Sequence, residues 1–154
     1  MKRVIGLDVG DRSIGIAISD ELWITTRGLF TISRTNIKSD TQKVMEIVKE
    51  NDCSHVIIGL PVNLSGEDSK QTEKVREFAE KLKNKLLSNS MGDREVVLYD
   101  ERFSTVIANR EMEEAGLKKN KKREIIDQQA AAVILEDWIR TNRDRVMTNE
   151  GDIK

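Results

Sequence analysis

Hydrophobic and polar positions alternate most regularly at the start of the chain. Residues 3–9 (RVIGLDV) and 13–19 (SIGIAIS) each have the pattern of a strand, and a tight turn joins them. A third strand is predicted at 27–33. The apolar run HVIIGL at 55–60 is typical of a strand buried on both faces, and a last strand is predicted at 95–100. We therefore expect an antiparallel meander followed by parallel strands.

Two helices are predicted between the later strands. Ser39 and Gln42 have capping-box spacing, and an amphipathic pattern follows them to about Glu50. Ser65 and Asp68 have the same spacing ahead of a longer apolar stripe. Both segments are therefore expected to pack one apolar face against the sheet.

Two more helices are predicted after the last strand. Ser104 or Thr105 would cap the first, and Gly116 would end it. The second is expected from about Glu124 to Asn142. The resulting order, β-β-β-α-β-α-β-α-α, predicts an α/β fold.

Length and composition limit the classes of protein that fit. A chain of 154 residues with 38% hydrophobic and 34% charged residues suits one soluble domain, which we assign to residues 1–142, with a frayed tail at 143–154. The single cysteine, Cys53, excludes a disulfide framework and suits a reducing cytoplasm. No apolar run approaches the roughly 18 residues of a membrane span, and the start of the chain has no signal-peptide pattern.

Three acidic residues stand where hydrophobic residues are expected. Asp8 ends an apolar strand, Glu101 follows the last strand, and Asp127 heads the apolar stripe of the final helix. The alanines in that stripe would let the helix lie close to the sheet. If the sheet is as predicted, all three acids meet at one edge, where a cation would offset their repulsion. Oxygen ligands favour Mg²⁺ or Mn²⁺, as in phosphoryl chemistry.

Each acid also has a structural explanation. Asp8 could accept hydrogen bonds from turn amides near Gly10. Glu101 could pair with Arg102 or cap the next helix, and Asp127 could be a first-turn acid favoured by the helix dipole. Convergence of all three favours the metal site over these separate roles.

Four segments together resemble the YqgF-type nucleases, a ribonuclease-H-like group whose members are described as Holliday-junction resolvases or as nucleases of precursor 16S rRNA. The segments are GLDVGDRSIGIAISD, GLPVNLSG, DERFST and DQQAAAVIL, in the family's order. The stretch DVGDRSIG alone also resembles the first phosphate loop of actin-like ATPases, but the chain has no second such loop. The resemblance implies an α/β ribonuclease-H-like fold, with a five-stranded mixed sheet flanked by helices. It also implies Asp8, Glu101 and Asp127 as catalytic and metal-binding residues.

The first turn departs from that family pattern. Family members often carry a hydroxyl residue at the position of Asp11 and a second basic residue at that of Ser13. Arg12 keeps one positive charge in the turn. Asp11 could be a fourth metal contact or could weaken phosphate binding, and both alternatives stay open.

Several residues are candidates for contact with the substrate backbone. The segment GLPVNLSG lies between a strand and a helix, where open α/β sheets bind ligands, although an ordinary turn is the alternative. Arg102 could bind a phosphate or form an ion pair, and the run KKNKKR could neutralise phosphates without reading sequence. The predicted substrate-binding residues are Gly10, Arg12, Asn63, Ser65, Arg102, Lys118, Lys119, Lys121, Lys122 and Arg123.

These patterns lead to a functional hypothesis. We expect a cytoplasmic Mg²⁺- or Mn²⁺-dependent nuclease that processes precursor 16S rRNA. Its partners would be nucleic acid, with structured RNA preferred and branched DNA as the alternative, and a ribosomal precursor particle. A Holliday-junction resolvase and a non-catalytic nucleic-acid-binding module are the other hypotheses. We expect a monomer or weak dimer, and we expect His55 to be a surface or edge residue rather than a ligand.

Overall fold

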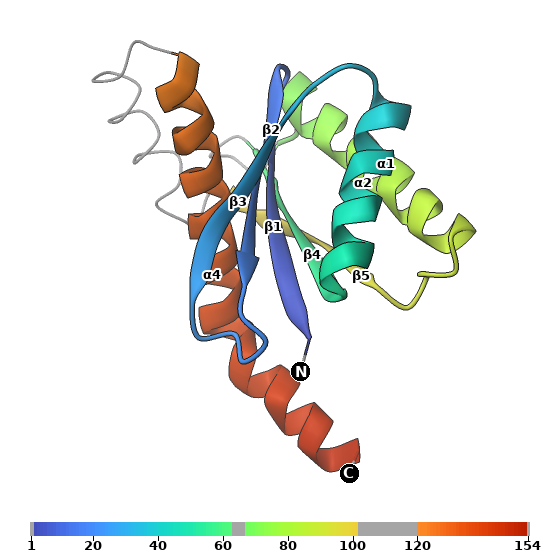
Figure 1. Ribbon diagram of the computed structural model, residues 1–154, viewed down its shortest axis with the longest axis vertical. Coiled ribbons are helices and arrows are strands. Elements are labelled where there is room, and N and C mark those ends of the chain that lie inside the picture. The colour runs from blue at the N-terminus through green and yellow to red at the C-terminus, as the bar shows by residue number, and fades with distance from the viewer. Residues whose placement is uncertain (1, 63–66, 102–119, 154) are drawn as a thin grey trace.

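One five-stranded sheet organises the chain (Figure 1). The computed structural model describes residues 2–62, 67–101 and 120–153, and the side chains of the last helix over 124–145. The strands are β1 (Arg3–Val9), β2 (Ser13–Ser19), β3 (Thr26–Ser33), β4 (Cys53–Leu60) and β5 (Glu95–Asp100), in the spatial order β3-β2-β1-β4-β5. The first three pair antiparallel, and β4 is parallel to both β1 and β5. The predicted meander followed by parallel strands is confirmed.

Helices cover both faces of this sheet (Figure 1). On one face lie α1 (Ile37–Asn51) and α2 (Lys70–Ser88), and on the other lies α4 (Asn120–Ile153). The bounds predicted for α4 are too narrow at both ends. The helix predicted after Ser104 or Thr105 lies outside the described residues, and the division at residue 142 stays a prediction. None of the helices in the described ranges is both long and apolar enough to cross a membrane.

Both predicted capping boxes are wrong. Asn36 caps α1, and its side chain accepts a hydrogen bond from the Ser39 amide at 2.8 Å, so Ser39 lies inside the helix. Ser69 and Thr72 form the capping box of α2, later in the chain than the predicted pair. Ser, Asn and Asp are frequent near both helices, so spacing alone could not select the cap.

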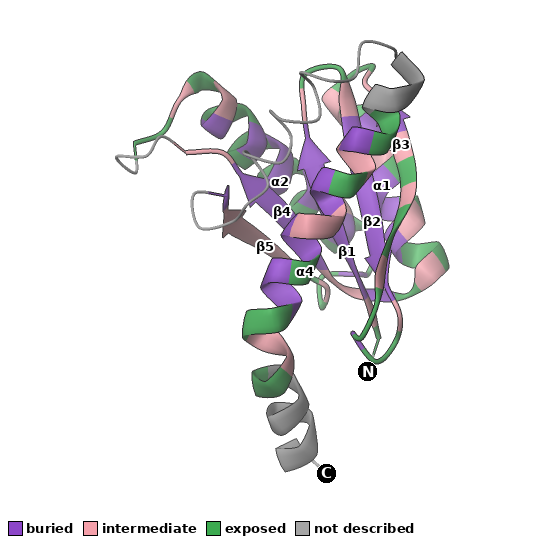
Figure 2. Ribbon diagram, turned by 90° about the vertical axis from the view of Figure 1, so that its left-hand side faces the viewer, coloured by how far each residue is buried: buried purple, intermediate pink, exposed green. Residues whose placement is uncertain are grey.

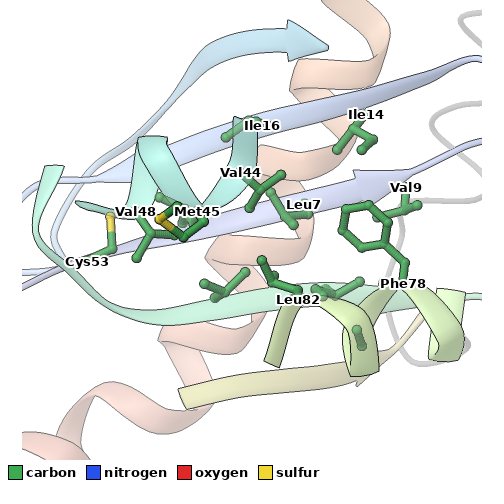
Figure 3. Close-up of a cluster of buried hydrophobic side chains, with 14 of the residues drawn as sticks. Leu7, Val9, Ile14, Ile16, Val44, Met45, Val48, Cys53, Phe78 and Leu82 are labelled. Atoms are coloured by element: carbon green, nitrogen blue, oxygen red, sulfur yellow. The ribbon is translucent and has the colours of Figure 1, made fainter. Parts of the chain in front are cut away.

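The inner strands β1, β2 and β4 are largely buried (Figure 2), and the two faces of the sheet carry different side chains. Alternate residues of β1 and β2 point toward α1 and α2, where they form the larger core with Met45, Val48 and Cys53 (Figure 3). Figure 3 labels in that core Leu7, Val9, Ile14, Ile16, Val44, Phe78 and Leu82. The intervening residues of the same strands face α4. The three candidate acids Asp8, Glu101 and Asp127 lie on this second face.

An aromatic cluster closes one end of the α4 face. The Trp23 and Trp138 ring centroids are 5.3 Å apart, and His55 contacts both rings. Trp23 has a positive φ of 57°, and its Nε1 donates to the Lys2 carbonyl at 2.6 Å. The expectation of a surface or edge position for His55 is wrong: β4 is an interior strand, and the His55 side chain is only 15% exposed.

Candidate active site

Asp8 lies between two glycines at the end of the sheet opposite the tryptophans. Its side chain is on the α4 face, and the residue is only 9% exposed. Gly15 is its register partner on β2. On β4, Gly59 follows Ile58, the register partner of Leu7, and so flanks Asp8 on the other side. The sheet therefore leaves open space on both sides of this carboxylate.

Asp127 occupies the space above Gly15. A Cβ atom on Gly15 would lie 2.2 Å from the Asp127 carbonyl oxygen and 2.9 Å from its Cβ. Only a glycine permits α4 to approach this closely. The Oδ2 atom of Asp127 accepts a hydrogen bond from Ser13 Oγ at 2.5 Å. A close helix crossing and a strand hydroxyl therefore fix the position of this carboxylate.

Glu101 occupies the corresponding space above Gly59. The residue follows β5 directly and is 3% exposed. Its Oε1 atom lies 2.7 Å from the point where a Gly59 Cβ would be, and Ile134 Cδ1 lies 2.5 Å from the same point. Larger residues at Gly59 would displace this carboxylate, so the glycine makes room for it.

Asp8 and Glu101 line one cavity of about 250 Å³, together with Val9, Gly10, Asp11, Gly59, Pro61 and Gln71. Asp127 lies at the same edge of the sheet but its carboxylate is held by Ser13. Among the described residues, no three acidic, histidine or cysteine side chains are already close enough together to hold a metal ion. The three acids lie at one edge of the sheet, as predicted. Within the described ranges, however, they do not form a closed cluster of three carboxylates. The oxygen donors of the two cavity residues nonetheless fit a hard cation.

Of the predicted contacts in the first turn, Gly10 is half-buried and lines this cavity. Arg12 is exposed, and the Gly10 amide donates to the Ser13 carbonyl at 2.9 Å. Asp11 lines the cavity and pairs with Lys74 of α2 at 3.2 Å. Outside the described residues lie Asn63, Ser65, Arg102, Lys118 and Lys119. Lys121, Lys122 and Arg123 belong to the start of α4, and their side chains are not described.

Sequence reasoning missed two contacts that shape the site. Ser13 is 114 residues from Asp127 along the chain. The Arg34 guanidinium donates to the Gly10 carbonyl at 2.7 Å, and these two residues are 24 positions apart. No spacing rule connects residues so far apart. The sequence signal for Ser13 was its departure from the family pattern, and none was available for Arg34.

Two side chains with shifted pKa values lie away from the cavity. Burial, with a smaller contribution from Asp52, raises the pKa of the Cys53 thiol to about 12. Burial and then Asp137 raise the pKa of Tyr99. Cys53 therefore stays a protonated core residue at neutral pH, which excludes it as a nucleophile.

Sequence comparison identifies the family of this chain. Residues 2–141 match the profile of RuvX, described as a Holliday junction resolvase. The chain belongs to the RuvX family. A RuvX-type relative from Myxococcus xanthus, named "Putative pre-16S rRNA nuclease", is 40% identical over 92% of this chain and 89% of its own length. One of the same name from Fusobacterium nucleatum is 44% identical over 90% of this chain and 97% of its own. The family resemblance carried by the four segments is thereby confirmed.

Solved structures confirm the fold of this RuvX-family chain. RuvC from Thermus thermophilus, in complex with a Holliday junction substrate, superimposes with a TM-score of 0.59 at 14% identity, covering 92% of this chain and 96% of that one. The yeast mitochondrial Holliday junction resolvase Ydc2 gives a TM-score of 0.50 at 10% identity, covering 96% and 84%. The ribonuclease-H-like fold predicted from sequence is the one observed.

Proposed function

We propose that this protein is a metal-dependent nuclease that hydrolyses phosphodiester bonds in precursor 16S rRNA in the cytoplasm. The observation that carries the proposal is the placement of Asp8 between Gly15 and Gly59, with Asp127 and Glu101 above those glycines. Carboxylates that are held at one edge of a largely apolar sheet lose solvation and repel one another unless a cation offsets their charge. The names of the 40%-identical relatives support the choice of substrate.

Asp8, Glu101 and Asp127 would hold Mg²⁺ or Mn²⁺. A bound divalent ion supplies an activated water and offsets charge on the leaving oxygen. Asp8 is fixed by the strand on which it lies, and Glu101 is held against Gly59. The Ser13 hydroxyl donates to Oδ2 of Asp127 and so orients this carboxylate. Gly10, which lines the cavity, and Arg12, which is exposed in the same turn, would contact the phosphate next to the cleaved bond.

Residues on neighbouring segments would bind the rest of the backbone. Asn63, Ser65 and Arg102 would contact flanking phosphates, and the basic run at 118–123 would add contacts without base recognition. Trp23 and Trp138 are buried, so neither offers a base-stacking surface. Shape of the RNA, or a ribosomal precursor particle, would then supply specificity.

The basic run can be tested by the salt dependence of binding. Replacing Lys118 and Lys119 with Gln should weaken RNA binding about equally for different sequences, and should lower the slope of log K against log salt by about two phosphate contacts. Replacing Lys81 and Lys83 of α2 with Gln is the matched charge control and should leave the slope as in wild type. An unchanged slope for the first pair would show that the run is only a solvated loop.

Resolution of four-way DNA junctions is the second candidate, because the family profile is described by that activity. A resolvase makes paired cuts, which requires two sites related by a two-fold axis. We propose instead a monomer or weak dimer, since the outer faces of α1 and α2 are dense in Lys and Glu.

A cleavage assay separates these functions. Purified protein is given precursor 16S rRNA or a four-way DNA junction, each with Mg²⁺, Mn²⁺ or EDTA, and light scattering measures its size. We expect metal-dependent cleavage of the RNA by a monomer or weak dimer. A stable dimer that makes paired nicks in the junction and leaves RNA intact would establish the resolvase. Binding without cleavage of either substrate would establish a non-catalytic module.

A further inference from the structure

The turn between β1 and β2 connects two residues of the proposed site. It begins one residue beyond Asp8, after Val9, and leads to Ser13, whose hydroxyl holds Asp127. Any change in the turn would therefore move both carboxylates at once. Besides Arg34, three contacts among the described residues hold the turn: the Gly10 amide donates to the Ser13 carbonyl, Gln71 Nε2 donates to the Val9 carbonyl at 3.3 Å, and Lys74 pairs with Asp11 at 3.2 Å.

Arg34, just beyond β3, binds this turn at two points. Its Nη1 atom donates to the Gly10 carbonyl at 2.7 Å, and its backbone amide donates to the Arg12 carbonyl at 2.9 Å. The carbonyls on both sides of Asp11 are thus tied to one residue. One residue therefore holds the turn through both its side chain and its backbone amide.

A buried acid holds the guanidinium in place. Asp40 of α1 is fully buried, and its Oδ2 accepts from Arg34 Nε at 2.7 Å. Its Oδ1 accepts from the amide and the hydroxyl of Thr35 at 3.2 and 3.3 Å. The guanidinium also lies 5.4 Å from the Phe78 ring centroid. These contacts use Nε and Nη1 and tie the guanidinium to α1 and to the turn.

We propose that Arg34 and Asp40 are positioning residues for the active site, and this inference rests on the proposed nuclease function. Removing a buried ion pair in favour of apolar residues often costs little stability, so its presence beside the site is better explained by what it orients. The planar guanidinium reaches Asp40 and the Gly10 carbonyl at once. A lysine offers a single ammonium group and cannot reproduce this fork.

The test compares Arg34 with a matched arginine far from the site. Arg94 has a side chain 15% exposed, against 22% for Arg34, and pairs with Asp52 at 3.0 Å at the other end of the sheet. Arg34→Gln, Arg34→Lys and Arg94→Gln are purified. For each, we measure the free energy of unfolding, kcat and KM on RNA, the Mg²⁺ concentration for half of the metal-induced Tm shift, and hydrogen exchange of the Gly10 amide.

For Arg34→Gln, below its Tm, we expect kcat to fall about 10- to 100-fold, with little change in KM. The half-saturating Mg²⁺ concentration should rise, and the Gly10 amide should exchange faster. Arg34→Lys should recover most of the stability but not kcat, whereas Arg94→Gln should keep wild-type kcat and Gly10 exchange. If Arg34→Gln fails to fold, Arg34→Lys carries the same comparison.

The outcomes separate this inference from the proposed function. Wild-type kcat, metal response and Gly10 exchange in the Arg34 variants would overturn the positioning role while leaving the nuclease intact. Absence of cleavage and of any metal-induced Tm shift in wild type would overturn the nuclease. In that case, hydrogen exchange of the Gly10 amide in Arg34→Gln would still test whether Arg34 holds the turn. Faster exchange than in wild type would support this role, and unchanged exchange would overturn it.

Discussion

The two faces of the central sheet differ in the size of the side chains that they carry. Toward α1 and α2, the strands present branched aliphatic residues such as Leu7 and Ile16, which fill a dry core. Toward α4, the neighbouring residues Asp8 and Gly15 are acidic or small, and the backbone of α4 comes within contact of the sheet. One face is thus wholly a core, while the other combines a second apolar cluster with carboxylates that close approach holds in fixed positions at one end. Neighbouring residues of β1 and β2 therefore have different roles: one packs in the aliphatic core, and the next faces the proposed site.

Removing the charge of Asp8 should break the acidic face most severely. Asp8→Asn should abolish metal-dependent cleavage, and the free energy of unfolding without metal should stay unchanged or rise, because repulsion with Glu101 in the shared cavity is relieved. Urea denaturation and the Mg²⁺-induced Tm shift measure the two effects. The Tm shift should be larger in wild type than in the variant. An inactive variant that is also much less stable without metal would instead support a turn-bonding role for Asp8.

The residue before Asp8 tests the opposite face. Leu7 is fully buried in the aliphatic core, so Leu7→Ala should lower the free energy of unfolding by about 2–5 kcal/mol. Cleavage per folded molecule and the metal-induced Tm shift should be retained at a temperature where the variant is folded. Loss of metal response in folded Leu7→Ala would show that the two faces are not separable.

Neighbouring residues of β2 allow a comparison of one methyl group on each face. Gly15→Ala adds a carbon that would lie 2.2 Å from the Asp127 carbonyl oxygen, so α4 must shift. We expect a loss of about 1–3 kcal/mol from overpacking, together with reduced cleavage. Ile16→Val, on the aliphatic face, should cost about 0.5–1.5 kcal/mol with cleavage retained. Equal activity in the two variants would contradict a functional role for the close helix crossing.

The smallest effect is expected at Ser13. Ser13→Ala removes the hydroxyl that orients Asp127 and should cost about 0.5–1.5 kcal/mol, with a higher Mg²⁺ concentration needed for half of the metal-induced Tm shift. Ser13→Thr keeps a hydroxyl and should restore the metal response. If alanine and threonine variants respond to metal alike, the hydrogen bond has no part in metal binding.

Much of the fold followed from local pattern. The bounds of β1, β2 and β5 match the predicted ranges, because each strand is a short apolar or alternating run between polar turns. The N-caps of α1 and α2 were not predicted correctly, because the residue that caps a helix depends on contacts with other parts of the chain. Asn36, for example, starts α1 beside the turn that Arg34 and Asp40 hold together.

The site was predictable only in part. Asp8, Glu101 and Asp127 could be singled out because an acid in an apolar pattern is conspicuous, and the structure places all three at one edge of the sheet. The hydrogen bond that turns Asp127 toward Ser13 could not be predicted, because it joins residues 114 positions apart. Asp40, read alone, resembles any first-turn acid of a helix, and only its burial identifies it as part of an ion pair.

The contact between Trp23 and Trp138 determines what spectroscopy of this protein reports. These are the chain's two tryptophans, and both lie between α4 and the sheet with ring centroids 5.3 Å apart. Intrinsic fluorescence and any exciton signal in near-ultraviolet circular dichroism therefore record the docking of α4 alone. The core under α1 and α2 contributes Phe78 and no indole. A partly folded state that keeps this core but releases α4 would therefore show nearly the full unfolding change in tryptophan fluorescence while retaining much of its far-ultraviolet signal.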